Sequence, residues 1–313
     1  MQDISFERQV AIVTGAGRSL GRDYALDLAR RGASVVVADV GGLGSGAGAW
    51  ADHVVAEITA AGGRALACYD SVATSEGADA ILEAARRAYG HVDILVHNAG
   101  FLRPGMLENL SDTQWREILD VHLAAAFFLA RSAWGPMKVQ GYGRIVLTSS
   151  SAVFGFEGGA NYGAAKAGIL GLTTALAEEG ARHGIRVNAI LPYAISDIAV
   201  DNPMPEGEAR RHRTVLSAMD SRRHSRSVSP IVAYLASRAC TVTGQAYSAL
   251  AGRYARVAFT VGGGWVGDPN EVTAEDIRDH LPEIDDLTTG FSPQNMAGEI
   301  DSVYADLQRK GLL

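Results

Sequence analysis

Short apolar segments alternate with longer segments of helical period from residue 10 to residue 190. Each short segment is apolar on both sides, as a strand is when helices cover both faces of a parallel sheet. The expected strands are Val10 to Val13, Ser34 to Ala38, Arg64 to Cys68, Ile94 to His97, Arg144 to Leu147 and Arg186 to Ile190. The expected helices are Tyr24 to Arg30, Trp50 to Ala60, Ala78 to Ala88, Thr113 to Trp134 and Tyr162 to Ala181. This alternation predicts a doubly wound α/β fold with a parallel sheet.

The chain has 313 residues, of which 47% are apolar and 20% charged, with a net charge of −7. A chain of this length can bury its core within one domain, so we expect residues 1–313 to form a single domain. The acidic balance argues against a nucleic-acid partner. Cys68 and Cys240 form no CxxC pair, so neither a disulfide framework nor a metal site is expected. Without a signal peptide or an apolar run of membrane length, we expect a soluble cytoplasmic protein with no membrane partner.

Two charged segments interrupt the alternating pattern. Ala209 to Arg226 holds six arginines and one acid, and Asp268 to Asp286 is acidic with Arg278 as its one cation. One interpretation is a solvated surface, or two segments that partly pair with each other. The other is that the arginines lie at an entrance and attract a phosphorylated substrate, such as a coenzyme A thioester.

A glycine-rich turn, Thr14 to Gly21, links the first strand to the helix that follows. Glycines let the backbone approach a pyrophosphate, and the helix N-terminus supplies N–H donors. The expected cofactor contacts in this turn are Gly15, Arg18, Ser19, Leu20 and Gly21. The next strand ends at Asp39, whose carboxylate can accept hydrogen bonds from the adenosine ribose and would repel a 2′-phosphate, which favours NAD over NADP. Arg18 is the residue that could still hold a 2′-phosphate.

Tyr162 and Lys166 are four residues apart and share one face of the expected helix. A free tyrosine is a poor base at neutral pH, but a neighbouring ammonium favours the phenolate. The serines at 149–151 end a strand, and one of their hydroxyls can hold a substrate oxygen while the tyrosine moves a proton. A plain amphipathic helix would also show this spacing, but the glycine turn and Asp39 together favour catalysis.

These motifs resemble those of the short-chain dehydrogenase/reductase family, TGxxxGxG, NNAG and S…YxxxK. The matching segments are Thr14 to Gly21, His97 to Gly100, and Ser150 with Tyr162 and Lys166, within a resemblance that spans roughly Val10 to Val266. The resemblance implies a Rossmann-type domain, hydride transfer with NAD(P), and a homodimer or homotetramer. It also implies cofactor contacts at Asp70, Ser71, Asn98, Ala99, Gly100, Tyr162, Lys166 and Ile195.

Departures from the family pattern affect Ser19, His122 and the catalytic serine, and leave two alternatives open. Ser19 replaces a usual glycine, so a positive φ at this position would be strained. His122 stands where the wider family has a catalytic Asn, and it either joins a proton relay or is a core histidine bound to a backbone carbonyl. The catalytic serine is Ser150 if the strand sets the alignment and Ser149 if the usual spacing to the tyrosine does. We expect Ser150, because loops absorb deletions more readily than strands.

A narrower resemblance points to one branch of the family. It lies in Val37 to Gly42, Ala67 to Val72 and Asp120 to Leu123, which are similar to the (3R)-hydroxyacyl-CoA dehydrogenase part of peroxisomal multifunctional enzyme type 2 and to actinobacterial relatives. This suggests NAD-dependent oxidation of a secondary alcohol of lipid metabolism, a 3-hydroxyacyl-CoA or a hydroxysteroid. An NADPH-dependent ketone reductase, with Arg18 as phosphate clamp, is the first alternative. A non-catalytic dinucleotide-binding redox sensor is the second.

The resemblance also shapes the expectations for the C-terminal third. A substrate lid is expected around residues 197–230, and an acidic extension from about residue 267. Gly244-Gln245 and Val257 to Gly264 are interpreted as the family's last strand, interrupted by an insert.

Overall fold

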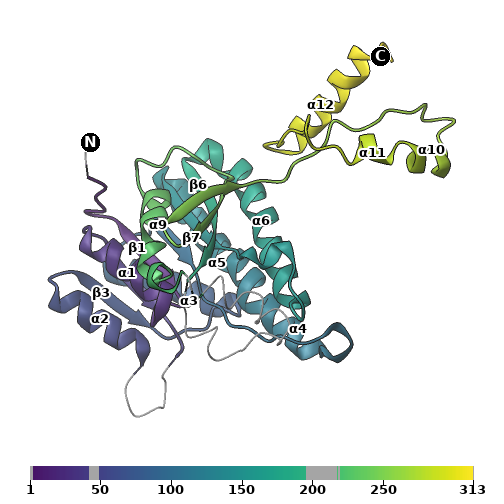
Figure 1. The fold of residues 1–313 in the computed structure, drawn as a ribbon. Helices are drawn as coiled ribbons and strands as arrows, with labels where there is room; N and C mark the ends of the chain where they lie inside the picture. Colours follow the sequence, from purple (N-terminus) through teal and green to yellow (C-terminus); the bar gives the residue numbers. More distant parts are fainter. Residues whose placement is uncertain (1–2, 42–48, 195–216, 218, 313) are drawn as a thin grey trace. The chain divides into compact units, whose positions relative to one another are not determined.

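The computed structural model describes residues 3–41, 49–194, 217 and 219–312 (Figure 1). The chain divides into two compact units, residues 1–256 and 257–313. The division does not test whether the chain behaves as a single domain, so that expectation stays a prediction.

The first unit is built on an eight-stranded sheet in the order β3-β2-β1-β4-β5-β6-β7-β8. The strands are β1 (Val10–Thr14), β2 (Ser34–Ala38), β3 (Arg64–Cys68), β4 (Ile94–His97), β5 (Gly143–Thr148), β6 (Ile185–Tyr193), β7 (Ala246–Leu250) and β8 (Arg253–Val257). Every pairing from β3 to β7 is parallel. The predicted doubly wound α/β fold is confirmed, and the strand order reverses between β1 and β4, where such folds open a crevice for ligands.

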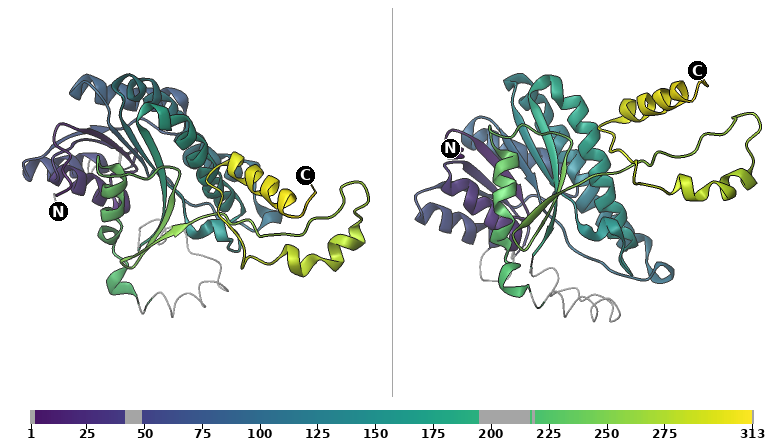
Figure 2. Two further views of the ribbon diagram at one scale, coloured as in Figure 1. Left: turned by 90° about the horizontal axis from the view of Figure 1, so that it is seen from above. Right: turned by 45° about the horizontal axis from the view of Figure 1, so that its top comes forward.

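Helices cover both faces of this sheet (Figures 1 and 2). The helices α1 (Ser19–Arg30), α2 (Trp50–Ala60) and α9 (Ser229–Ala236) pack on one face, and α3 (Ser75–Tyr89), α5 (Ala125–Gln140) and α6 (Ala160–Gly180) pack on the other. Val35 and Val37 of β2 join the buried cluster under α1 and α2, while the equally buried Val36 points the opposite way. The two-sided apolar runs read from the sequence therefore mark strands buried on both faces.

The long helix expected over Thr113 to Trp134 has three parts. It begins as α4 (Asp112–Leu119), continues as a π-helical turn over Asp120–Ala124, and ends as α5 at Gln140. A π turn holds one residue more than an α turn, and such single turns are frequent at functional sites. The spacing of apolar residues in the sequence did not indicate this extra residue.

The last parallel strand lies elsewhere than expected. β7 begins directly after Gln245 and pairs with β6, and two residues, Ala251 and Gly252, connect it to β8. Both have positive φ, +53° and +82°, as a tight hairpin turn of type I′ requires. The interpretation of a strand interrupted by an insert is therefore wrong, because the last parallel strand continues directly from Gln245 and Val257 to Gly264 takes no part in it.

The second unit contains the acidic segment and the short helices α10 (Ala274–Asp279), α11 (Leu281–Ile284) and α12 (Met296–Arg309). An isolated antiparallel bridge joins Val261 and Phe291, and no residue of the three helices is buried. The lid expected around 197–230 falls mostly outside the described residues. Within the described ranges, no helix combines the length and apolarity needed to cross a bilayer.

Candidate active site

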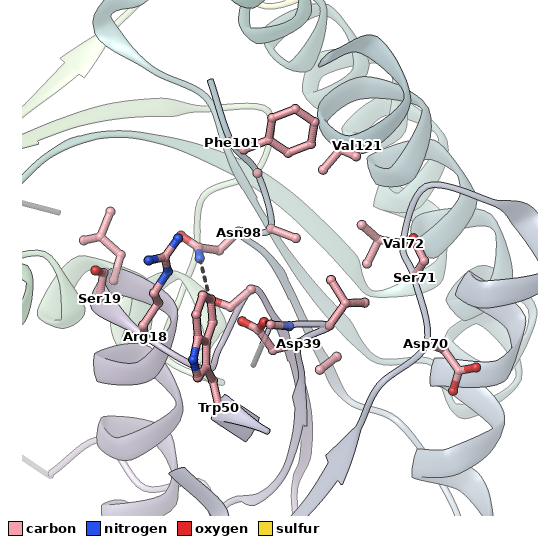
Figure 3. A pocket seen from close by; sticks show the side chains of 17 residues that line it. Arg18, Ser19, Asp39, Trp50, Asp70, Ser71, Val72, Asn98, Phe101 and Val121 are labelled. Atoms are coloured by element: carbon pink, nitrogen blue, oxygen red, sulfur yellow. Dashed lines mark hydrogen bonds between the residues drawn. The ribbon is translucent and has the colours of Figure 1, made fainter. Parts of the chain in front are cut away.

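A pocket of about 250 Å³ opens beyond the carboxyl ends of β1, β2 and β4. Figure 3 shows the side chains that line it. Ten of the predicted cofactor contacts are among them: Gly15, Arg18, Ser19, Leu20, Asp39, Asp70, Ser71, Asn98, Ala99 and Gly100. The crevice therefore forms where the sheet order reverses, as the fold predicts.

The glycine turn packs backbone against backbone. A Cβ on Gly15, which has φ +62°, would lie 2.6 Å from the Cα of Ala99. A Cβ on Gly21 would lie 2.1 Å from the Gly15 carbonyl oxygen, so this predicted contact supports the turn from within instead of lining the pocket. Ser19 has φ +48°, so it adopts the positive φ that is strained for a residue with a Cβ.

The first turn of α1 suits an anion. Ser19 and Leu20 border the pocket, and the helix begins without a side-chain cap and without an acid in its first turn. Uncapped N–H groups and the positive end of the helix dipole attract a phosphate. Together with the glycine cradle, this end of the pocket fits the pyrophosphate of a dinucleotide.

Asp39 is held in the pocket wall by two backbone donors. Its carboxylate oxygens accept N–H hydrogen bonds from Gly17 at 2.8 Å and from Gly41 at 2.7 Å. The indole of Trp50 lies against Gly41, and the Arg18 guanidinium stacks 4.3 Å from the centre of the Trp50 rings (Figure 3). Sequence reasoning missed Trp50, because no spacing links a residue after a glycine-rich stretch to the pocket.

Tyr162 lies in the first turn of α6 and is fixed by the residue before it. The Asn161 side chain accepts the Tyr162 backbone N–H at 2.7 Å and donates to the Arg103 carbonyl at 3.0 Å. The Tyr162 ring meets His122 and Phe156 edge-on, with ring centres 5.2 Å and 6.4 Å away. Asn161 was also missed, because its hydrogen bonds end on backbone groups, which no residue spacing marks.

Lys166 lies one turn further along α6, with its side chain buried. Its Nζ lies 5.6 Å from the Tyr162 ring centre and donates to the Thr148 carbonyl at 2.6 Å. Burial lowers the pKa of Lys166 to about 7. Burial also raises the pKa of Tyr162, and a hydrogen bond with the Ser150 hydroxyl opposes that rise. The expectation of a lowered tyrosine pKa is therefore corrected, because desolvation outweighs the favourable contacts.

The two candidate serines have different surroundings. The Ser149 hydroxyl is buried and donates to the Lys166 carbonyl at 2.7 Å. The Ser150 hydroxyl acts on the Tyr162 phenol, whose pKa it lowers, and accepts the Ala152 N–H at 3.2 Å. Ser149 thus ties β5 to α6, while Ser150 contacts the tyrosine.

His122 projects from the π turn and is buried. Its Nε2 lies 2.8 Å from the Phe101 carbonyl oxygen and 3.3 Å from the Phe101 backbone nitrogen, and its Nδ1 has no hydrogen-bond partner among the described residues. Burial lowers the pKa of His122 far below its usual value, and the Lys166 ammonium adds to the shift. The ring is therefore neutral, bound to a backbone carbonyl as one alternative expected, and yet in contact with Tyr162.

The predicted catalytic residues Ser150, Tyr162, Lys166 and His122 form one cluster beside the pocket. They do not line the pocket, but Gly100 does, and a Cβ on Gly100 would lie 2.0 Å from Cε1 of His122. Ile195 lies outside the described residues, so its predicted cofactor contact stays a prediction.

A family model described as short chain dehydrogenase matches residues 9–207. The chain belongs to the short-chain dehydrogenase family. Membership makes it an oxidoreductase that uses NAD(P).

Several short-chain dehydrogenases are similar over most of this chain. A short-chain type dehydrogenase/reductase of Mycobacterium tuberculosis is 43% identical over 284 residues, which cover 90% of this chain and 95% of that protein. Peroxisomal multifunctional enzyme type 2 of Mus musculus is 39% identical over 331 residues, which cover 99% of this chain and 41% of the mouse enzyme. This short-chain dehydrogenase thus spans less than half of the mouse protein.

Solved structures show the same fold. Full-length peroxisomal multifunctional enzyme type 2 from Drosophila melanogaster gives a TM-score of 0.78 at 32% identity, covering 98% of this chain and 50% of the fly protein. A short chain dehydrogenase from Mycobacterium avium gives 0.77 at 33% identity, covering 90% of this chain and 98% of the other. The narrower resemblance read from the sequence is therefore confirmed.

Proposed function

We propose that this chain is an NAD-dependent dehydrogenase of a secondary alcohol, with a 3-hydroxyacyl-CoA or a hydroxysteroid as its substrate. The observation that carries the proposal is the cluster of Ser150, Tyr162 and Lys166 beside the dinucleotide pocket. The Ser150 hydroxyl lies close enough to the Tyr162 phenol to lower its pKa, and Lys166 is buried one turn away, with its Nζ 5.6 Å from the Tyr162 ring centre. A binding protein without catalysis would need none of these three groups.

The preference for NAD is supported by Asp39. Two backbone N–H groups fix its carboxylate in the pocket wall, where its charge would repel a 2′-phosphate. Arg18 borders the same pocket and is the feature that favours NADPH and ketone reduction as the second candidate. Its guanidinium stacks on Trp50 through its flat face, whereas a 2′-phosphate would bind to its in-plane N–H edge.

The reaction needs a proton carrier and a group that orients the substrate. NAD, when bound, supplies the hydride acceptor. Ser150 holds the alcohol oxygen, and Tyr162 takes the hydroxyl proton during oxidation or returns it during reduction. Because the pKa of Tyr162 is raised, its phenol is neutral near pH 7; it can donate to a ketone as it stands, and it must first lose its own proton before it can take one from an alcohol. Lys166 contributes positive charge beside the phenol while it is protonated, and the neutral His122 ring supports the tyrosine edge-on.

The proposed substrate class is supported by the similar proteins and by two arginines of the arginine-rich segment. The similarity to peroxisomal multifunctional enzyme type 2 favours a lipid-derived alcohol. Arg222 and Arg223 belong to the arginine-rich segment, and the Arg223 guanidinium lies 5.9 Å from the centre of the Tyr193 ring at the end of β6. If these arginines attract a coenzyme A phosphate, their replacement by alanine will raise KM for a thioester and leave KM for a neutral ketone unchanged.

The test is turnover followed by NADH absorbance, with 3-hydroxyacyl-CoA esters of both configurations, hydroxysteroids and simple secondary alcohols as substrates. We expect Ser150→Ala to lower kcat by about 10²-fold or more, as loss of a group positioned for proton transfer does. Ser149→Ala is the matched control and should have a mild effect. Retention of turnover in Tyr162→Phe would refute the mechanism, and nucleotide binding without turnover on any substrate would favour the sensor alternative.

Cofactor choice is tested separately by the Kd values for NAD and NADP. We expect tighter NAD binding by the unchanged protein and a smaller difference in Asp39→Ala, because the charge that repels a 2′-phosphate is removed. Tighter NADP binding by the unchanged protein would instead support the reductase alternative.

A further inference from the structure

His97 ends β4 directly before the pocket residues Asn98, Ala99 and Gly100 and is buried on all sides. Its Nδ1 lies 2.9 Å from the Thr14 hydroxyl, and its Nε2 lies 3.2 Å from the His122 carbonyl oxygen. The imidazole thus bridges the glycine-rich turn, which follows Thr14, and the π turn, which carries His122.

The hydrogen bonds around Thr14 determine which ring nitrogen carries the proton. The Thr14 hydroxyl accepts the backbone N–H groups of Asn98 at 3.1 Å and of Ala99 at 3.2 Å. A hydroxyl has two lone pairs and one hydrogen, so its hydrogen remains for Nδ1 of His97. Nδ1 is therefore the acceptor, and the neutral ring carries its proton on Nε2 and donates it to the His122 carbonyl. A second proton on Nδ1 would meet an oxygen whose lone pairs are both in use.

We propose that His97 is a positioning residue that couples the cofactor-binding turn to the π turn that holds His122 against Tyr162. This inference rests on the proposed function only for its kinetic readout. The Thr14 half of the bridge supports the Asn98–Ala99 backbone in the pocket wall. The other half holds the π turn, whose Val121 also lines the pocket and whose His122 ring meets the tyrosine edge-on. A buried polar atom that loses its hydrogen-bond partner destabilises its surroundings, so removing either hydrogen bond of His97 should have a measurable effect.

Two substitutions separate the halves of the bridge. In His97→Asn, the amide oxygen reaches about the depth of Nδ1 and accepts from Thr14, but nothing reaches the His122 carbonyl. In His97→Gln, the amide nitrogen reaches about the depth of Nε2 and donates to that carbonyl, but Thr14 loses its acceptor. We expect His97→Asn to keep the Kd for NADH within about threefold while kcat falls about tenfold, which corresponds to about 1.4 kcal/mol. We expect His97→Gln to keep kcat within about threefold and to weaken NADH binding about tenfold.

A purely structural role would lower kcat and weaken NADH binding together in both variants, and that outcome overturns the proposal. An absence of any effect on kcat and on NADH binding also overturns it. NADH binding is measured by fluorescence and needs no substrate, so failure of the proposed reaction leaves this half of the test intact. The tautomer is read independently from nitrogen-15 shifts of histidine-labelled protein, with the His97 signals assigned by their loss in either variant. A proton found on Nδ1, or on both nitrogens near neutral pH, would also overturn the proposal.

Discussion

The buried lysine makes a quantitative prediction about stability. The pKa of Lys166 is about 7 in the folded protein against an ordinary value of 10.5, because its ammonium is removed from water. Between these two values the unfolded chain holds a proton that the folded chain has released. The free energy of unfolding should therefore rise with pH across this window, by up to about 1.4 kcal/mol per pH unit. Below pH 7 the folded protein bears the full cost of burying the protonated Lys166, which is about 5 kcal/mol.

Lys166→Met removes this charge and keeps the length of the side chain. We expect the variant to have the larger free energy of unfolding. The difference from the unchanged protein should decrease by about 3 kcal/mol as the pH rises from about 6.5 to about 9.5. The Thr148 carbonyl loses its donor in the variant, but this cost does not depend on pH and leaves the narrowing unchanged. At the same time kcat should fall by orders of magnitude, as active sites often exchange stability for activity.

The measurement is urea denaturation, followed by circular dichroism, of both proteins at several pH values across this range and without added nucleotide. The matched control is Lys138→Met, the same substitution at an exposed lysine on α5. Two stability curves that stay parallel with pH would refute the reasoning, whatever their absolute separation.

Three further predictions concern the pocket. Ser19→Gly should raise the free energy of unfolding by about 0.5–1 kcal/mol, because glycine adopts the positive φ at this position without strain; thermal or urea unfolding measures it. Gly100→Ala places a Cβ 2.0 Å from Cε1 of His122, so we expect a loss of about 1–3 kcal/mol in stability together with a lower kcat. Trp50→Phe should remove most of the tryptophan quenching that NADH causes, because Trp50 lines the pocket and stacks with Arg18; unchanged quenching would place NADH elsewhere.

The strands of the sheet could be predicted from the sequence far better than the connections between them. Strands such as β2 and β4 matched their expected limits, because burial on both faces leaves only apolar residues in a run. The β7–β8 hairpin was missed, since its turn depends on positive φ at Ala251 as well as at Gly252, and alanine seldom signals such a turn.

The site shows a similar division. Residue type and spacing placed Tyr162 and Lys166 on one face, and the strand alignment pointed to Ser150, which contacts the tyrosine in the structure. The direction of the Tyr162 pKa could not be foreseen, because it depends on how far the folded chain removes the phenol from water. The second bond of His97 could not be foreseen either, since it ends on a backbone carbonyl, which no residue type marks.

The π turn between α4 and α5 bears on how this segment tolerates length changes. Elsewhere in either helix, losing one residue would rotate everything downstream by about 100° and carry buried side chains such as Leu129 and Ala133 into solvent. Within Asp120–Ala124, a one-residue deletion can instead convert the wide turn into an ordinary one and leave both flanking helices in register. The same segment is thus where an insertion during evolution would have been accommodated most easily, and where a shortened homologue should be sought first.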